Sequence, residues 1–464
     1  MNSGKKSLGR PFSRLLIATA VSAAFTSVTA HADDKAEIEK LKAQIQELDQ
    51  KLRVLDRKQE LAAEELAAKQ KSAPVVNASE KGFGFKSADG QLEYRLRGLV
   101  HFDYRDFSGD AFPTATDGFL ARRIRPTFEG TVFGKYGFRF TPEFGENKSA
   151  VVDAYLDLKH NPAAQIRVGK FKPFVGLERL QGGADIKFIE RSYVSNNILP
   201  NRDLGVSVFG DVLDNRLNYA VGVFNGSIDG GENTTAQDVN SDKEFAARIF
   251  TTPFAGTDSP LQGLGIGVAG TTGTSSLTTS TSAQGVPSYK TPGQANNFFA
   301  YASNVASNGT RSRWSPQAYF YKGPFGLIAE YAEVSQDLIN ASNTRATAHN
   351  SAWQLAGSWL LTGEDASFKG VKPYSPFKLG AEGGWGAIEL LARYQENRID
   401  ASLPTAFRTS GNYALTAKST ALGANWYLNE SSRLALNYEV TDFEGGSLNG
   451  KREKLLVARY QLAF

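Results

Sequence analysis

The chain has 464 residues, a formal net charge of +4, no cysteine, and 52 aromatic side chains beside 45 glycines. This length allows two or three soluble domains or one large barrel. After the N-terminus no run of 18 apolar residues occurs, which excludes a membrane-spanning helix. Abundant glycine, phenylalanine and tyrosine favour strands and turns over helices. The lack of cysteine is compatible with export, although cytosolic proteins also occur without it.

The N-terminus has the three parts of a secretory signal peptide, predicted over residues 1–32. A basic region containing Lys5, Lys6, Arg10 and Arg14 precedes the apolar segment LLIATAVSAAF, and Ala30-His31-Ala32 forms the cleavage motif. The alternative is a buried N-terminal helix. Removal of this segment takes away four positive charges and no negative charge, so the mature chain would be neutral. Any attraction for anions must then come from where the charges lie.

Residues 33–71 are predicted to form an α-helical coiled coil. Apolar residues recur with alternating spacings of three and four, at Ile38, Leu41, Ile45, Leu48, Leu52 and Leu55. This narrow seam favours self-association, and a trimer is compatible with it. Residues 72–82, SAPVVNASEKG, contain a proline and small polar residues and are predicted to form a linker.

From residue 83 the apolar period changes from that of a helix to that of a strand. In LEYRLRGLVHFDY, residues 92–104, apolar and polar side chains alternate, with Leu99 as an apolar exception on the polar face. The strand is about 13 residues long, whereas soluble strands are usually about 5–6 residues long. The same pattern recurs to the end of the chain, which predicts roughly sixteen strands. Gly/Ser/Thr-rich segments such as 271–285 are predicted loops, and residues 296–305 fit either a strand or a long loop.

Long strands with one apolar and one charged face, joined alternately by tight turns and long loops, predict a transmembrane antiparallel β-barrel of about sixteen strands over 83–464. A bilayer admits only helices and closed barrels, because each backbone polar group needs an internal partner. A soluble β-sandwich is the alternative, but it does not explain why charged residues repeat on the inner face of successive strands.

Three arginines occur within four positions of one predicted strand, ARRIRPTFEG at 121–130. A lysine or arginine facing lipid at mid-membrane costs about 2–4 kcal/mol, so the period-2 pattern assigns Arg123 and Arg125 to a water-filled lumen. Arg122 is out of phase with this pattern. Either it extends to the membrane surface near a strand end, or a bulge near Pro126 turns it inward.

The segment KFKPFVGLERLQGGADIKFIERSYVSNNILPNRD, residues 170–203, loses the strand period and is rich in basic residues. Loops of this length are usually functional or disordered, and this one retains apolar residues typical of a buried segment. We therefore expect residues 173–203 to fold into the lumen and narrow it. A loop that covers the outside of the barrel is the alternative.

Seven stretches between residues 83 and 464 resemble a known family: ARRIRPTFEG, DAYLDL, VGKFKPFVGLERL, FIERSY, LLTGEDASFKGVKP, GAIELLARY and LGANWYLNES. They are similar to the phosphate- and polyphosphate-selective porins (porin O/P) of Gram-negative outer membranes. The resemblance implies a homotrimeric sixteen-stranded barrel in outer-membrane lipid. It also implies passive uptake of phosphate or other small anions past arginines and lysines.

The resemblance also implies a set of anion-binding residues at the constriction. Its members are Arg122, Arg123, Asp153, Arg179 and Arg191, to which the strand register adds Arg125. Glycines at 182 and 183 depart from the family pattern, in which serine hydroxyls that can bind phosphate oxygens follow the basic loop residue, so the sequence does not decide between phosphate and other anions. A steering cluster of Lys369, Lys372 and Lys378, and an upper arginine track of Arg311 and Arg313, are weaker matches, for which solvated loop charges are the alternative.

Three other functions compete with a selective anion channel. A general or weakly selective porin for small solutes, such as organic acids or sugars, is favoured by Gly182 and Gly183. An enzyme is not expected, because no nucleophile motif accompanies the histidines. The predicted coiled coil could serve as a periplasmic or cell-wall tether beside a pore. The sequence predicts no metal site, cofactor or nucleic-acid module.

Overall fold

The computed structural model describes residues 32–464, except 80–81, 235–240, 280–281 and 381–382. The predicted signal peptide, 1–32, therefore lies outside the described residues apart from Ala32. The chain divides into two units, Met1–Ala73 and Pro74–Phe464, which are described separately. In the described part of the chain, no helix combines the length and the apolar character that crossing a bilayer requires.

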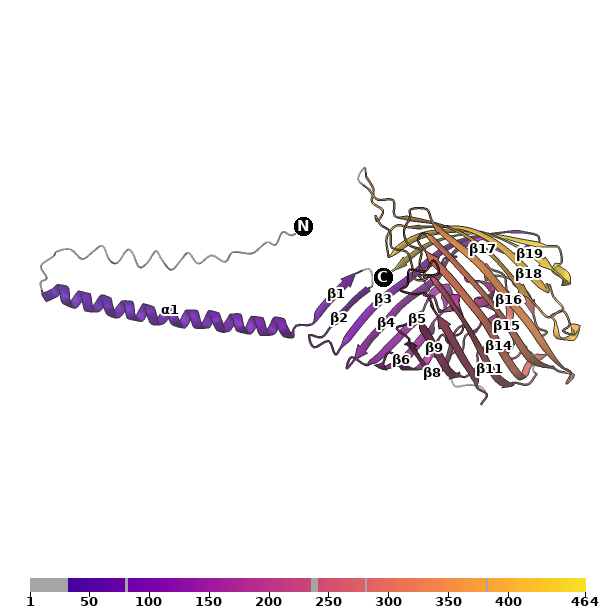
Figure 1. The fold of residues 1–464 in the computed structure, drawn as a ribbon, viewed down its shortest axis with the longest axis horizontal. Helices are drawn as coiled ribbons and strands as arrows, with labels where there is room; N and C mark the ends of the chain where they lie inside the picture. The colour runs from indigo at the N-terminus through magenta and orange to yellow at the C-terminus, as the bar shows by residue number, and fades with distance from the viewer. Residues whose placement is uncertain (1–31, 80–81, 235–240, 280–281, 381–382) are drawn as a thin grey trace. The chain divides into compact units, whose positions relative to one another are not determined.

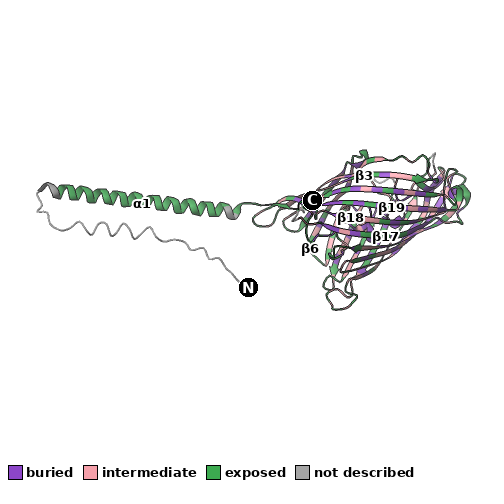
Figure 2. Cartoon of the chain, turned by 90° about the horizontal axis from the view of Figure 1, so that it is seen from above, coloured by how far each residue is buried: buried purple, intermediate pink, exposed green. Residues whose placement is uncertain are grey.

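The first unit contains one 41-residue helix, α1 (Ala32–Ser72), so the predicted helix is confirmed. Ion pairs between residues four apart follow its surface, for example Lys51 with Glu47 at 2.7 Å and Arg53 with Asp49 at 2.9 Å. The six apolar residues of the predicted seam are exposed to solvent by 44–63% (Figure 2). Helices gain most of their stability from packing of an apolar face. The coiled coil itself remains a prediction.

In the described residues of the second unit, sixteen strands close into an antiparallel barrel (Figure 1). They are β3 (Glu93–Gly109), β4 (Gly118–Val132), β5 (Tyr136–Glu143), β6 (Ala150–Asn161), β7 (Ala164–Phe171), β8 (Asp203–Val212), β9 (Leu217–Phe224), β10 (Glu244–Thr251), β11 (Leu264–Ser276), β14 (Val305–Lys322), β15 (Phe325–Asn340), β16 (Arg345–Leu360), β17 (Ala387–Arg398), β18 (Thr416–Tyr427), β19 (Ser432–Glu444) and β20 (Arg452–Ala463). The last strand pairs with the first, with Leu462 opposite Val100, and this pairing closes the barrel without a free edge.

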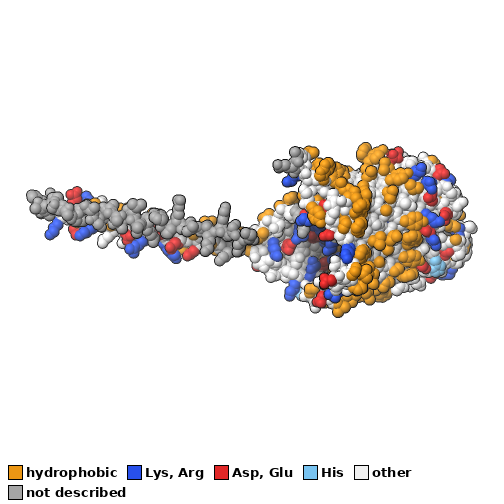
Figure 3. Space-filling view, turned by 45° about the horizontal axis from the view of Figure 1, so that its top comes forward, with side chains coloured by type: hydrophobic (Ala, Val, Ile, Leu, Met, Phe, Trp, Pro, Cys, Tyr) orange, Lys and Arg blue, Asp and Glu red, His pale blue; other side chains and the backbone are white. Residues whose placement is uncertain are grey.

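Side chains alternate between the inside and the outside of the barrel, as the period-2 pattern predicts. On β20, Glu453, Arg459 and Gln461 are buried inside, whereas Tyr460 and Leu462 are exposed outside. Hydrophobic side chains are spread over the outer wall, and charged side chains gather nearer its two ends (Figure 3). This distribution suits a wall surrounded by lipid that encloses a polar interior.

An arginine on the outer wall should destabilise the barrel. We expect Leu436→Arg on β19, where the leucine is 48% exposed, to lower the free energy of unfolding in lipid vesicles by about 2–4 kcal/mol. Gln262→Arg, in the exposed turn between β10 and β11, is the matched control and should change it by less than about 0.5 kcal/mol. Equal effects in urea titrations would contradict an outer wall in contact with lipid.

The predicted linker, 72–82, differs from the structure. Residues Val75–Ser79 form β1, which pairs with β2 (Gly82–Lys86), and β2 in turn pairs with the start of β3. Alternation is hard to detect in five residues, but the unpaired edge of a neighbouring strand offers backbone partners to any extended segment. The barrel sheet is thus extended by a hairpin where the sequence indicated only a connection.

One predicted loop also differs in part, and a segment that the sequence left open is resolved. Residues 271–276 of the low-complexity segment 271–285 belong to β11, because residues 271–273 pair with both β10 and β14 and residues 274–276 pair with β14. The ambiguous segment 296–305 lies within a long connection and contains a short strand, β13 (Asn297–Ala300), paired with β12 (Ser288–Lys290). Strand pairing with both neighbours outweighs the weak β-propensity of glycine and serine.

Connections at one end of the barrel are mostly longer, although residues 341–344 between β15 and β16 form a short turn, and those at the other end are mostly short turns. The 26-residue connection 361–386 between β16 and β17 is an exception, because it lies at the end of the short turns. It turns back toward the barrel, where the amide of Ala366 donates to the carbonyl of Gly323 and Phe368 stacks on Tyr319.

Candidate functional site

The connection from β7 to β8, residues 172–202 and here called the inner loop, is largely buried within the barrel. It contains a single helical turn, α2 (Leu177–Leu180), and a π-helical turn, η2 (Val194–Ile198). Inward side chains of the barrel bind its backbone: Arg393 donates to the carbonyl of Glu190 at 3.0 Å, and Arg459 donates to that of Ile189 at 2.7 Å. Because a buried loop must find partners for its peptide groups, these polar side chains fix its course.

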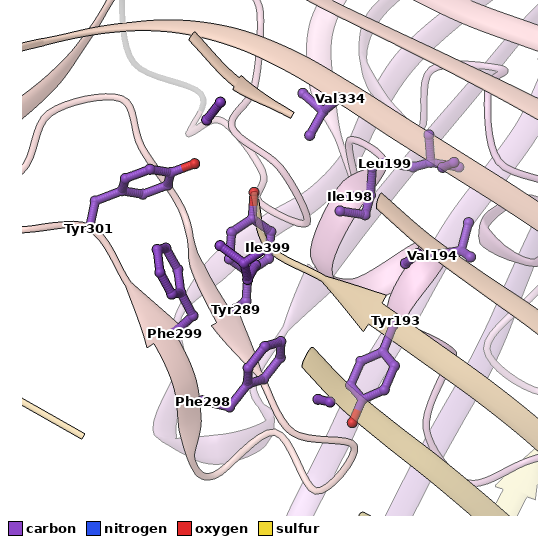
Figure 4. Close-up of a cluster of buried hydrophobic side chains, with 14 of the residues drawn as sticks. Tyr193, Val194, Ile198, Leu199, Tyr289, Phe298, Phe299, Tyr301, Val334 and Ile399 are labelled. Carbon is purple, nitrogen blue, oxygen red and sulfur yellow. The ribbon is translucent and has the colours of Figure 1, made fainter. Parts of the chain in front are cut away.

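A buried apolar cluster holds the other end of the inner loop (Figure 4). Tyr193, Val194, Ile198 and Leu199 of the loop pack with the hairpin β12–β13 and with inward residues of β14 and β15. The packed partners include Tyr289, Phe298, Phe299, Tyr301, Val305, Val334 and Leu338. Close packing of this kind resists displacement, so the inner loop is a fixed element on the side of the lumen formed by β14–β19.

A buried carboxylate joins the inner loop to the strands with the clustered arginines. Glu190 accepts hydrogen bonds at 2.7 Å from Arg105 and from Arg122, and ion pairs at 3.5–3.8 Å add Arg459 and Arg123. At an effective dielectric constant near 20, charges about 4 Å apart interact by about 4 kcal/mol. The buried Asp103 also accepts hydrogen bonds from Arg105 at 2.9 Å and from Arg459 at 2.6 Å, so two carboxylates, of which only Glu190 reaches all four arginines, hold the guanidinium groups together.

The out-of-phase Arg122 is explained by a β-bulge. The register of β3 and β4 moves from His101–Arg123 to Phe102–Ala121, which leaves Arg122 as the extra residue. The bulge lies at Arg122 itself, not near Pro126, which stays in register opposite Gly98. Arg122 consequently points inward to Glu190, and Arg123 beside it contacts Nδ1 of His101 at 3.0 Å.

A cavity of about 330 Å³ lies between the inner loop and the wall formed by β3–β7. Six cationic side chains line it, from four strands and both ends of the inner loop: Arg97, Arg125, Arg139, Arg167, Lys172 and Arg202. The acidic side chains among the lining residues are Asp153 and Asp185. Of the predicted anion-binding residues, Arg125 and Asp153 are thus at the cavity.

Carboxylates hold the cavity arginines from the side. Arg125 binds Glu143 at 2.6 Å, Arg139 binds Glu129 at 3.0 Å, and Arg167 binds Asp157 at 2.7 Å. None of these three carboxylates is among the described lining residues. Arg202 is paired with Asp153 at 2.8 Å, and both members of this pair line the cavity. The side chains that line the cavity therefore carry more net positive charge than the lining arginines and all their carboxylate partners taken together.

Arg179 and Arg191 hold the inner loop to itself. Arg191 donates to the carbonyl of Gln181 at 2.7 Å, and Arg179 donates to the carbonyl of Ser195 and to Asn201 at 3.1 Å. Together with Arg122 and Arg123, they are not among the described residues that line the cavity. The structure thus divides the six predicted residues into two at the cavity and four that fix its surroundings.

The weaker steering residues lie elsewhere. Arg311 and Arg313 are buried and bind Glu244 at 2.8 and 2.6 Å, and Arg313 also binds Asp229. Neither is among the described residues that line the cavity, and their place in an upper arginine track stays a prediction. Lys369, Lys372 and Lys378 are exposed on the connection 361–386, where Lys372 pairs with Glu430 at 2.8 Å.

The family described as phosphate-selective porin O and P matches residues 94–464, which include all sixteen barrel strands except the first residue of β3. The chain belongs to this family. The curated relative Porin O of Pseudomonas aeruginosa is 23% identical over 401 residues, covering 79% of this chain and 86% of the relative.

Solved structures support the same fold for this porin. The outer-membrane channel DcaP of Acinetobacter baumannii has a TM-score of 0.52 at 12% identity, covering 82% of this chain and 99% of that one. OmpF of Salmonella typhi has a TM-score of 0.50 at 11% identity, covering 84% and 100%. The chain is an outer-membrane porin, and its family and barrel indicate a channel rather than an enzyme.

Sequence reasoning missed several cavity residues of the porin. Arg139 on β5 and Arg167 on β7 lie on the polar faces of strands that the sequence predicts. Which inward residues they lie beside depends on how these strands pair with their neighbours, and the sequence does not show that. Lys172 and Arg202 are basic residues of the segment 170–203, but nothing in the sequence places them opposite Asp153. Glu190 was also missed, because a single glutamate in a basic loop gives no signal of its four partners.

Proposed function

We propose that the porin is an anion-selective channel and that anions pass through the cavity between the inner loop and β3–β7. The observation that carries this proposal is the cavity lining, in which six cationic side chains accompany two carboxylates. Arginine stays protonated in proteins, and its planar fork matches the oxygens of phosphate and carboxylate groups. The arrangement therefore favours negative solutes.

The partial neutralisation of the arginines suits conduction. An isolated cluster of guanidinium groups would bind an anion too tightly, because conduction needs sites that the ion can also leave. The carboxylates beside Arg125, Arg139 and Arg167 weaken each site without placing negative charge on the cavity surface. Asp153, which does line the cavity, moderates Arg202 in the same way.

The reversal potential of the purified porin in a planar bilayer across a KCl gradient tests this proposal. We expect its sign to report chloride as the more permeant ion.

We further propose that phosphate or polyphosphate is a transported anion, which the family supports. Residues Gly182 and Gly183 favour a second candidate, a weakly selective porin for small solutes. A Cβ atom on Gly183 would lie 2.7 Å from Leu99, and one on Gly182 would meet the carboxylate of Asp185. Serine hydroxyls therefore do not fit here without movement of these neighbours. Block of chloride current by inorganic phosphate would support the first candidate, and its absence the second.

We propose export by a cleaved signal peptide and assembly into a trimer through the exposed seam of α1. Deletion of residues 33–72 should leave single-channel conductance unchanged, because the cavity lies within the barrel unit. It should lower the temperature at which trimers dissociate on gels, because apolar surface would no longer be buried between helices.

Ile45→Ser with Leu52→Ser should reproduce this loss, whereas exchange of the exposed Lys51 for Ser should not. An unchanged dissociation temperature would contradict a stabilising coiled coil, and would leave the tether as the role to test by cell-envelope fractionation.

A further inference from the structure

Two apolar patches lie within the cationic cavity. The first patch comprises Leu99 on β3 and Leu180 and Ala184 on the inner loop. The second comprises Tyr155 on β6 with Phe171 and Phe174, where β7 passes into the inner loop. The cationic side chains of β4 and β5, Arg125 and Arg139, come from strands between those that carry the two patches. The lining is thus amphipathic rather than uniformly polar.

Both patches are built into the structure. In the first, Gly183 lies so close to the Leu99 side chain that a Cβ atom at position 183 would be 2.7 Å from it, so a side chain there would displace Leu99. In the second, the rings of Tyr155 and Phe174 lie 6.1 and 6.0 Å from Phe171. The guanidinium group of Arg167 stacks 3.9 Å above the ring of Tyr155, an arrangement that presents charge and aromatic surface side by side.

We infer that the cavity prefers organic anions with an apolar body, namely aromatic or cyclic aliphatic carboxylates, over inorganic or polyhydroxylated anions of equal charge. This inference rests on the proposed function. A carboxylate would pair with the guanidinium forks, while its ring displaces water from the apolar patches, which is favourable. The volume is sufficient, since about 150 Å³ already holds a benzene molecule in a protein interior. An inorganic anion gains nothing from these patches.

Bi-ionic reversal potentials test this preference on the full-length porin. Sodium chloride fills one side of the bilayer, and the other side contains sodium benzoate, cyclohexanecarboxylate, gluconate or phosphate. The permeability of each anion relative to chloride is divided by its mobility relative to chloride in water. The expected result is that the corrected permeabilities of benzoate and cyclohexanecarboxylate exceed those of gluconate and phosphate by about threefold or more. A threefold ratio corresponds to about 0.7 kcal/mol, since 1.4 kcal/mol corresponds to tenfold. Equal corrected ratios, or a higher one for phosphate, would overturn the inference. A wild-type channel that prefers potassium to chloride would instead refute the proposed function.

Variants assign the preference to the first patch. Leu99→Asn and Leu180→Asn, made separately, should each lower the benzoate-to-gluconate ratio. Val100→Ala, on the outward face of the same strand, is the control and should leave it unchanged. Heat-modifiable migration on gels identifies folded barrels, and Leu180 lies on the inner loop rather than in a strand, so one variant does not interrupt the barrel. A ratio that stays at the wild-type value in both folded variants would show that this patch does not touch the permeating anion.

Discussion

Glu190→Gln should lower the free energy of unfolding of the porin by about 3–5 kcal/mol, the usual result of removing one partner from a buried ion pair. Its carboxylate holds Arg105 and Arg122 by hydrogen bonds of 2.7 Å and attracts Arg123 and Arg459 from 3.5–3.8 Å. The amide keeps the shape of the side chain but loses the charge. Arg105 and Arg459 would keep Asp103 as a partner, whereas Arg122 and Arg123 would lose the buried negative charge that balances them at the junction of the inner loop and β4. Urea titration in lipid vesicles measures the change.

The matched control is Glu146→Gln. Glu146 also pairs with Arg122, at 3.2 Å, but its side chain is 28% exposed, and pairs open to solvent contribute about 0–1 kcal/mol. We expect this variant to remain within about 1 kcal/mol of the wild type. Similar losses in the two variants would contradict the central role of Glu190 in holding the arginines.

The second large effect concerns the ion pair at the cavity. Arg202→Ala removes the arginine that binds Asp153 at 2.8 Å, so the lining loses one positive charge while the carboxylate stays. We expect the chloride-to-potassium permeability ratio to fall by about three- to tenfold, because a close pair of charges interacts by several kcal/mol before screening by salt. Asp153→Asn should raise the ratio, because it removes negative charge from the same surface.

The double variant completes a thermodynamic cycle. Arg202→Ala with Asp153→Asn removes both charges and should return the ratio toward that of the wild type, so the two effects are not additive. Arg345→Ala controls for the loss of one arginine, because Arg345 is exposed at the start of β16 and is not among the described cavity-lining residues. A loss of selectivity in this control equal to that of Arg202→Ala would place the selective region outside the cavity.

The barrel could be predicted from the sequence because lipid on one side and water on the other impose period 2 on every strand. The inner loop was also predictable, because it combines basic groups with apolar residues such as Phe188 and Ile189 and lacks strand alternation. The hairpin β1–β2 and the end of β11 were not predictable, since backbone pairing with a neighbouring strand decides them and their side chains carry little pattern.

The site was less predictable than the fold. Sequence identified the arginines but not their partners, and the partners decide what each arginine does. Arg125 and Arg313 are both inward on strands, yet Arg125 reaches the cavity, whereas Arg313 is fully buried between Glu244 and Asp229. In the sequence, the acidic partner of Arg125 lies 18 residues away, and those of Arg313 lie about 70–85 residues away. Only the closed barrel brings these groups together.

The absence of cysteine from the chain permits the most direct test of where anions pass. Thr127→Cys introduces a single thiol on the cavity wall. In the hydrogen bonds described for the threonine hydroxyl, its one partner is the hydroxyl of Thr141, at 3.1 Å. Channels in a bilayer are exposed to a negatively or a positively charged methanethiosulfonate. The rate at which each reagent modifies the cysteine is divided by its rate with a small free thiol. Thr344→Cys, in the exposed turn between β15 and β16, serves as the control. If anions pass through this cavity, the negative reagent reacts faster at position 127 and its attachment lowers the chloride current, while modification at 344 does not. Faster reaction of the positive reagent at 127, or an unchanged current after complete modification there, would contradict an anion path lined by these arginines.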